Sequence, residues 1–283
     1  MDEFLLSDIG GTNVRFALSN RAGTINALQT LPVQAFQSFE SALRQYLTEQ
    51  SVRPVSLIVA AAGPVTGRRV TLTNAPWEID GDFLSMSFDG LPVTLLNDLE
   101  AVAHALPTLG QHALRPVLSP AERPEYLKAP RLAINLGTGF GAAVAIPTLS
   151  RAWTILPTEA GHQKWETRIF AEERSTTVEG LLSGPGLAKA RATWKGSDVR
   201  PQWSAELGQV IRDLVLATGS WGGVYLCGGL IDDFEALVDA CELTQAFLAP
   251  GPMRNRLRAV PVWQITEPNP ALLGLATLIS NDA

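Results

Sequence analysis

One pattern occurs twice in this chain and constrains its fold more than any other: a short strand, a glycine-rich turn and a second strand. The first copy spans residues 3–19, where EFLLSD meets Gly10-Gly11 and NVRFALS follows. The second spans residues 131–146, where RLAIN enters a loop at residues 136–141 and AAVAI returns. Strand-like runs joined by a glycine turn predict a β-hairpin. The repetition predicts two related halves that face each other.

The segments after each hairpin predict alternating helices and buried strands. Apolar residues recur at helical spacing in some segments, and others form the continuous apolar runs of strands covered on both faces. Prolines punctuate residues 107–130, which we expect to be an irregular crossing between domains. An α/β fold with mixed sheets is therefore predicted. It has strands near residues 24–31, 55–62, 92–96, 223–227 and 260–265, and helices near residues 36–50, 99–106, 204–218 and 269–280.

The composition of the chain excludes several functional classes. Its 283 residues are 46% hydrophobic and 18% charged, which is typical of a globular protein. The net charge of −6, without a dense Lys/Arg run, argues against binding to nucleic acid or to an anionic membrane. The acidic start, MDEFLLSDIGG, lacks the basic residues of a signal peptide, and no apolar run approaches the roughly 20 residues of a membrane span. We therefore expect a cytoplasmic protein.

Two cysteines, Cys227 and Cys241, are separated by thirteen residues. We interpret them as reduced thiols in the core rather than as a disulfide or a metal pair.

The glycine turns carry the first candidate chemistry. Glycine lets a backbone approach a ligand closely, and the exposed N–H groups of such a turn attract phosphate oxygens. A carboxylate at the end of the preceding strand is a candidate ligand for Mg²⁺. Neither turn has the P-loop or the Rossmann pattern. Each turn taken singly could also be an ordinary hairpin turn without a ligand. The candidate residues are Asp8, Ile9, Gly10, Gly11, Thr12 and Asn13 in the first turn, and Gly137, Thr138, Gly139, Phe140 and Gly141 in the second.

Asn97 and Asp98 follow a predicted buried strand, at the end where ligands bind in open α/β sheets. An aspartate at this place can accept a proton from an attacking hydroxyl during phosphoryl transfer. The alternative is that Asp98 is only the N-cap of a helix beginning at Leu99.

A third polar cluster comprises residues 158–162 (TEAGH) and Glu179. Carboxylates and an imidazole can form paired hydrogen bonds with the vicinal hydroxyls of a sugar. His162 taken alone is more often a surface residue or a satisfied core residue than a ligand-binding one. His104 and His112 are distant in sequence, and no HExxH, CxxC or GxSxG motif is present, so neither a zinc site nor the commonest hydrolase motif is indicated.

These segments, in this order, resemble the bacterial glucokinase family of the actin/hexokinase/Hsp70 superfamily. The resemblance covers residues 5 to about 278. Each piece is weakly specific, whereas the ordered set is strongly so. The matching pieces are LLSDIGGTNVRFAL, AAAGPVTGRRVTLTNAPW, LLNDLEAVAHALP, LGTGFGAA, WTILPTEAGH, VEGLLSGPGL, LCGGL and NPALLGLATL.

The resemblance implies two ribonuclease-H-like α/β domains with a central cleft, formed by residues 1–106 plus 269–283 and by residues 107–268. It implies transfer of the γ-phosphoryl group of ATP to the 6-hydroxyl of glucose, Asp98 as the catalytic base, and commonly a homodimer. The turns at Asp8–Asn13 and Gly137–Gly141 would hold the ATP phosphates and Mg²⁺, with Asp8 at the metal and Gly228-Gly229 near the nucleoside. The residues implied to surround the sugar are Asn74, Asn97, Asp98, Glu159, His162 and Glu179.

Three departures from the family pattern concern the ligand sites. Asn135 stands where another glycine usually begins the second turn, and Thr158 and Ala160 replace glycines beside Glu159. Only 41 residues separate Leu187 from Gly229, where the family normally has a longer helical insert close to the adenine. The short segment predicts adenine binding that is weak, differently built, or relaxed toward other phosphoryl donors.

Two alternatives remain open. The first is a kinase for another hexose, such as mannose or N-acetylglucosamine, because carboxylates bind any hydroxyl-rich ring. The second is a protein of the same fold that senses a sugar and does not phosphorylate it. The short segment between Leu187 and Gly229 is the reason for considering this alternative. The zinc-binding Cys/His cluster of the related repressor/open-reading-frame kinases is not found in the sequence, so we assign no structural zinc.

Overall fold

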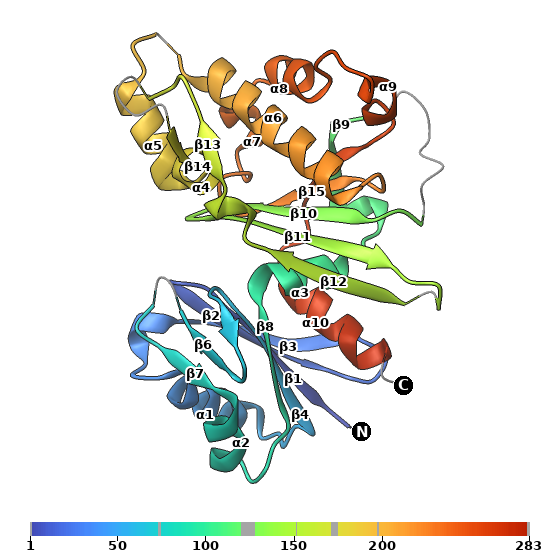
Figure 1. Ribbon diagram of the computed structural model, residues 1–283. Coiled ribbons are helices and arrows are strands. Elements are labelled where there is room, and N and C mark those ends of the chain that lie inside the picture. The colour runs from blue at the N-terminus through green and yellow to red at the C-terminus, as the bar shows by residue number, and fades with distance from the viewer. Residues whose placement is uncertain are drawn as a thin grey trace. The chain divides into compact units, whose positions relative to one another are not determined.

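The computed structural model describes residues 2–72, 75–119, 128–150, 152–170, 175–196 and 198–281. The chain forms two compact units, one of residues 1–107 with 268–283 and the other of residues 108–267 (Figure 1). The candidate residue Asn74 lies outside the described residues. Within the described residues, no helix is long and apolar enough to span a membrane.

The first unit is built on a five-stranded sheet in the order β3-β2-β1-β4-β8. β1 pairs antiparallel with β2 and parallel with β4, and β4 pairs parallel with β8. The carboxyl ends of β1, β4 and β8 therefore lie along one edge of the sheet. The strands are β1 (Phe4–Ile9), β2 (Asn13–Ser19), β3 (Ile25–Pro32), β4 (Ser56–Ala61) and β8 (Val93–Asn97).

Helices cover this sheet, and a small second sheet follows β4. α1 (Phe39–Gln50) packs through Phe39, Leu43 and Tyr46 in one cluster with side chains from β1, β2 and β4. α3 (Asp98–Ala105) packs against α10, and Gly274 allows the close approach because a Cβ there would collide with the carbonyl oxygen of Ala101. The other elements are the 3-10 helix η1 (Val33–Ala35), β5 (Val65–Thr66), β6 (Arg69–Thr71), β7 (Glu78–Asp80), α2 (Gly81–Ser87) and α10 (Pro270–Asn281).

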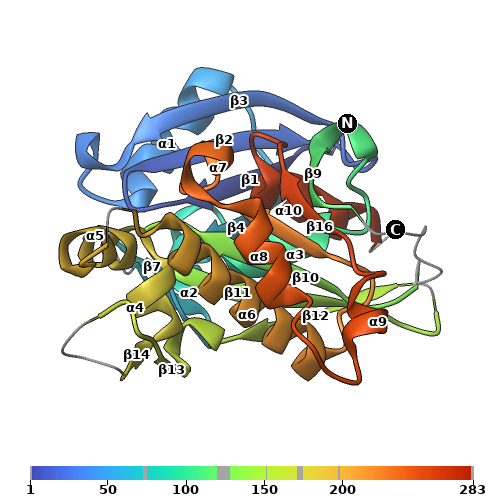
Figure 2. The same ribbon diagram turned by 90° about the horizontal axis from the view of Figure 1, so that it is seen from above.

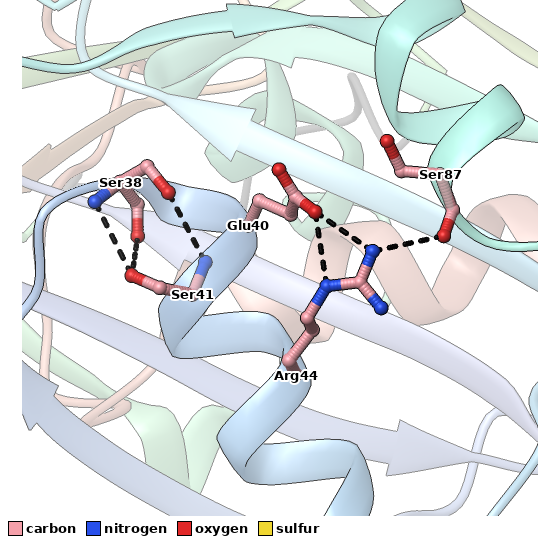
Figure 3. A network of polar contacts seen from close by, with 5 residues as sticks. All are labelled: Ser38, Glu40, Ser41, Arg44 and Ser87. Atoms are coloured by element: carbon pink, nitrogen blue, oxygen red, sulfur yellow. Dashed lines mark hydrogen bonds and ion pairs between the residues drawn. The ribbon is translucent and has the colours of Figure 1, made fainter.

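Local sequence fixes where α1 begins. The Ser38 and Ser41 side chains each accept a hydrogen bond from the other's backbone N–H, both at 3.2 Å, and form a capping box (Figure 3). One turn later, Arg44 donates to Glu40 and to the carbonyl oxygen of Ser87, at 3.1 Å for the latter, which ties α1 to the end of α2 (Figure 3). The helix therefore begins at Phe39, three residues later than the start at residue 36 that the sequence predicted.

The second unit is built on a six-stranded sheet in the order β12-β11-β10-β15-β16-β9. β10 pairs antiparallel with β11 and parallel with β15, as β1 pairs with β2 and β4 in the first unit. This correspondence confirms the prediction of two related halves. The strands are β9 (Leu114–Leu118), β10 (Arg131–Leu136), β11 (Phe140–Pro147), β12 (Trp153–Thr158), β15 (Val224–Cys227) and β16 (Val262–Ile265).

α6 (Arg200–Thr218) and α8 (Ala240–Phe247) lie over one face of this sheet in both views (Figures 1 and 2). Trp203 of α6 is fully buried and donates its indole N–H to the carbonyl oxygen of Leu181 at 3.0 Å. α6 thereby holds the end of the short helix α4. The remaining elements are η2 (Gln111–Ala113), η3 (Ala160–His162), β13 (Lys164–Glu166), β14 (Ser175–Thr177), α4 (Val178–Leu182), α5 (Gly184–Thr193), α7 (Phe234–Leu237) and α9 (Arg254–Leu257).

Two sequence-based expectations were wrong. Residues 107–130 are not wholly irregular, because β9 forms there and pairs with β16 at the edge of the sheet; Pro116 is compatible with an edge strand, which needs fewer backbone donors. Cys227 is a buried thiol as expected, but Cys241 is exposed on α8, and neither forms a disulfide.

Candidate active site

Asp8 lies at the carboxyl end of β1, on the face of the sheet opposite α1. Ile9 belongs to the cluster that packs on α1, and side chains alternate along a strand, so Asp8 points to the other face. Arg15 is its partner in the β1–β2 register and donates from Nη1 to Oδ2 of Asp8 at 3.1 Å. Burial raises the pKa of the Asp8 carboxyl, and the charge and hydrogen bond of Arg15 oppose that rise.

The first glycine turn closes tightly after Asp8. The N–H of Gly10 donates to the carbonyl oxygen of Asn13 at 3.0 Å, and Thr12 is exposed at the tip. Two carbonyl oxygens at the turn accept hydrogen bonds from neighbouring segments. The N–H of Ala62 donates to the carbonyl oxygen of Ile9, and the N–H of Val33 donates to that of Thr12. The turn is thus fixed by its neighbours, as a preformed anion-binding loop requires.

Asn97 caps α3, which rules out the alternative that Asp98 is only the N-cap. The Asn97 side-chain oxygen accepts from the N–H of Leu99 at 3.0 Å and of Glu100 at 3.4 Å, and its amide donates to the carbonyl oxygen of Gly63 at 3.2 Å. Asp98 is the first residue of the helix, and its Oδ1 accepts from the N–H of Leu99 at 2.9 Å. Because Asn97 is the cap, Asp98 is not needed for that structural role.

Burial and a neighbouring negative charge shift the pKa of Asp98. Its pKa is raised from 3.8 to about 6, first by burial and then by the negative charge of Asp8. Hydrogen bonds from the backbone N–H groups of Leu99 and of Asp98 itself, and from Asn97, oppose the shift. Asp98 is therefore ionised at neutral pH yet close enough to its pKa to accept a proton.

In the second unit, two glycine turns lie side by side. β10 and β15 are parallel neighbours, with Asn135 opposite Cys227, so the loop at Gly137–Gly139 and the turn at Gly228-Gly229 emerge from the same sheet edge. Gly228 has φ +103°, and a Cβ there would collide with Asn135 Oδ1 and with the carbonyl oxygen of Leu136. Asn135, which departs from the family pattern, thus packs beneath Gly228.

Glu159, His162 and Glu179 are grouped around the same loop. Glu159 and His162 are exposed, with 3.7 Å between Glu159 Oε2 and His162 Nε2. Glu179, in the first turn of α4, accepts from the backbone N–H of Phe140 at 3.0 Å. Gly161 lies between Glu159 and His162 in the sequence and packs against β11. A Cβ on Gly161 would lie 3.5 Å from Cβ of Glu179.

The candidate residues form two sets, one in each unit. Asp8–Asn13, Asn97 and Asp98 belong to the first unit, and the glycines at 137–139 and 228–229 with Glu159, His162 and Glu179 belong to the second. Arg15 was missed by the sequence analysis. Its signal was the single charge in the strand segment NVRFALS, at the position that a two-stranded hairpin places opposite Asp8. Among the described residues, no group of three or more His, Cys, Asp or Glu side chains is arranged to hold a metal ion.

The fold and the sequence place the chain among the sugar kinases. The glucokinase of an Antarctic psychrotroph superposes with a TM-score of 0.84 at 29% identity, covering 99% of each chain. The glucokinase of Balamuthia mandrillaris in complex with glucose superposes with a TM-score of 0.73 at 17% identity, covering 99% of this chain and 94% of that one, a likeness of fold alone.

Sequence comparison is more specific than the superposition. The family model described as Glucokinase matches residues 5–198 and 188–282. The glucokinase of Chromobacterium violaceum is 32% identical over 314 positions, covering 98% of this chain and 89% of that protein, and that of Marinobacter nauticus is 30% identical over 316 positions, covering 98% and 97%. The chain belongs to the glucokinase family.

The alignments extend over more positions than the 283 residues of this chain, because the relatives carry segments that are absent here. The two matched stretches overlap at residues 188–198, between the second half of α5 and the start of α6.

Proposed function

We propose that this protein transfers the γ-phosphoryl group of ATP to the 6-hydroxyl of glucose, with Asp98 as the general base. The observation that carries the proposal is the state of Asp98: a carboxylate at the start of α3, freed from capping by Asn97, with a pKa of about 6. As the sugar oxygen attacks, its O–H bond breaks and the proton passes to Asp98. The new O–P bond forms while the bond to the β–γ bridging oxygen breaks and ADP leaves.

The glycine turns are proposed to hold the nucleotide. Their backbone N–H groups suit phosphate oxygens, and the fixed conformations of Gly10–Asn13 and Gly137–Gly139 mean that little ordering is needed on binding. Gly228-Gly229, beside the second loop, is proposed to lie near the nucleoside. This assignment rests on the adjacency of β10 and β15 and on the family membership.

Asp8 is proposed to hold Mg²⁺. Mg²⁺ keeps several waters and binds through one or two carboxylates plus substrate phosphates, and a single partly buried carboxylate beside a phosphate-binding turn fits that donor set. The metal, when bound, neutralises charge on the phosphate oxygens. Arg15 supplies a positive charge next to Asp8 and opposes the rise in its pKa, which favours the ionised form that binds a cation.

The sugar is proposed to contact Asn97 and Asp98 in the first unit and Glu159, His162 and Glu179 in the second, with Asn74 as a further contact. The exposed Glu159 carboxylate and His162 imidazole suit hydroxyl groups, which both donate and accept hydrogen bonds, and so do the half-buried carboxylates of Asp98 and Glu179. Consistent with the family, we further propose that the protein is a cytoplasmic homodimer; light scattering on the purified protein measures the mass and decides between one chain and two.

A coupled assay of ADP release tests the proposed reaction. Purified protein with Mg-ATP is presented with glucose, mannose and N-acetylglucosamine, and turnover should be fastest with glucose. Turnover with only another hexose would change the substrate and keep the chemistry. Sugar binding in a calorimeter without turnover, for ATP and for every other donor tried, would overturn the kinase assignment and favour a sensor. Because the short stretch between Leu187 and Gly229 predicts relaxed use of phosphoryl donors, the donor panel includes GTP and inorganic polyphosphate.

A further inference from the structure

Glu179 makes a contact that binding a sugar does not require. Its Oε2 accepts a hydrogen bond from the backbone N–H of Phe140 at 3.0 Å. Phe140 is the first residue of β11 and directly follows the loop at Gly137–Gly139. The carboxylate therefore holds the trailing end of that loop. Among the described residues, Oε1 of Glu179 makes no hydrogen bond, so a second acceptor remains available.

The leading end of the loop is held by the same segment of chain. The N–H of Gly184, at the start of α5, donates to the carbonyl oxygen of Gly137 at 2.8 Å. Residues 179–184 thus form hydrogen bonds with both ends of the loop, from Glu179 to Phe140 and from Gly184 to Gly137. Trp203 of α6 in turn holds this segment through the carbonyl oxygen of Leu181.

The packing leaves little freedom for Glu179. A Cβ on Gly139 would lie 2.6 Å from Glu179 Oε2, so the carboxylate rests directly on the loop. Thr177 caps α4 through its hydroxyl, which accepts from the N–H of Gly180 at 2.9 Å and fixes the first turn of the helix. A shift of the Glu179 side chain must therefore move the loop or break the bond to Phe140.

We propose that Glu179 is a positioning residue that couples the sugar to the nucleotide: one carboxylate oxygen sets the loop at Gly137–Gly139 and the other takes a sugar hydroxyl. The inference deepens the proposed function and rests on its assignment of this loop to phosphate. A sugar bound to Oε1 restrains the carboxylate, and the restrained carboxylate favours the loop conformation that binds phosphate. Such coupling is reciprocal, so the nucleotide strengthens sugar binding by the same factor.

Three variants separate this role from a simple sugar contact. Glu179→Ala removes both the acceptor for Phe140 and the sugar contact. Glu179→Gln retains an amide oxygen able to accept from Phe140 but loses the charge. Glu159→Ala is the matched control, because Glu159 belongs to the same group and pairs with His162 instead of with the loop. Thermal unfolding of all three checks that each is folded.

The decisive measurement is binding of Mg-ADP to the sugar-free protein by calorimetry. Glu179→Ala should weaken it about fivefold, as for the loss of one hydrogen bond, and Glu179→Gln should stay within about twofold of the wild type. Glu159→Ala should weaken glucose binding alone. In the wild type, glucose should tighten Mg-ADP binding, and Glu179→Ala should reduce that effect. Equal nucleotide affinity in wild type and Glu179→Ala, or an equal loss in Glu159→Ala, would overturn the inference.

Hydrogen exchange separates failure of this inference from failure of the proposed function. The Phe140 amide should exchange faster in Glu179→Ala than in the wild type, whether or not a nucleotide binds. Unchanged exchange would overturn the positioning role alone. The opposite outcome is a wild-type protein that binds no nucleotide although Glu179 protects its Phe140 amide from exchange. That result would overturn the phosphate-binding role proposed for the loop, and the coupling with it.

Discussion

Asn97 donates its side-chain amide to the backbone carbonyl of Gly63 at 3.2 Å, and this bond ties the end of β8 to the turn that follows β4. The other end of the same side chain caps α3. One residue thus fixes the strand end, the neighbouring turn and the start of the helix, and Asp98 is positioned by all three. The helix cap and the proposed base, which the sequence offered as alternative roles for one residue, are two adjacent residues.

Asn97→Ala should lower the free energy of unfolding by about 2 kcal/mol, because it removes an N-cap and a hydrogen bond to Gly63, each worth about 1 kcal/mol. It should also lower kcat, since Asp98 loses its support. Ser38→Ala, which removes the cap of α1, is the control and should cost about 1 kcal/mol without changing kcat. Urea unfolding and steady-state kinetics measure both effects. A normal kcat in Asn97→Ala would show that Asp98 is positioned by other contacts.

Asp98→Asn should make the protein more stable at neutral pH. The folded-state pKa of about 6 lies above the ordinary aspartate value of 3.8, so between these values the folded state binds more protons, and stability falls as pH rises. At pH 7 the ionised Asp98 therefore destabilises the fold, by about 2 kcal/mol after allowance for partial exposure. Asparagine should recover that amount at pH 7 and almost none below pH 4. Urea unfolding of wild type and variant at pH 7 and below pH 4 measures the difference in stability. A variant less stable than the wild type at pH 7 would contradict the claim that the buried charge of Asp98 destabilises the fold.

The pH dependence of kcat/KM should have an acidic limb that breaks near pH 6, because activity requires ionised Asp98. Asp8→Asn is the informative comparison. It removes the negative charge that raises the pKa of Asp98, so the break in its residual activity should move to lower pH. ATP phosphates titrate in a similar range, and their break would not move. A limb that keeps its position in Asp8→Asn therefore belongs to the nucleotide and not to Asp98.

The two adjacent glycines at 228 and 229 should respond differently to alanine. Gly228 has φ +103°, and an added Cβ would collide with Asn135 and Leu136, whereas a Cβ on Gly229 meets nothing within 4 Å. Gly228→Ala should therefore cost about 2 kcal/mol or more of stability, and Gly229→Ala should stay within about 0.5 kcal/mol of the wild type. Chemical unfolding of the two variants measures this. Equal stabilities would show that the turn relaxes freely around an added methyl group.

The two hairpins and the main helices were predictable because they depend on local signals. The alternation in residues 13–19 and the continuous apolar run in residues 55–62 indicate strands whatever lies around them. β9 was not predictable, because Pro116 and the prolines on either side of the strand resemble a loop, and its pairing depends on β16, which lies more than a hundred residues later. The start of α6 at Arg200 was also missed, since its N-cap residue, Val199, has no capping side chain, and the N–H of Arg200 donates instead to Asp198, one position earlier.

The candidate site was predictable as a set of residues but not as a set of contacts. The motifs indicated Asp8, Asp98 and Glu179, because their residue types and order resemble the family. The ion pair of Asp8 with Arg15 depends on hairpin register, and the bond of Glu179 to Phe140 depends on a helix that folds back over a loop 39 residues away in sequence. Neither contact leaves a local pattern in the sequence.

The central claim, that Asp98 removes the proton from the sugar hydroxyl, is tested most directly by ADP release from Asp98→Asn with glucose and Mg-ATP, beside calorimetry of glucose binding. The account predicts a fall in kcat of about 10²–10⁴-fold, the usual contribution of a general base, with glucose affinity nearly unchanged. A variant that turns over glucose at close to the wild-type rate would contradict it.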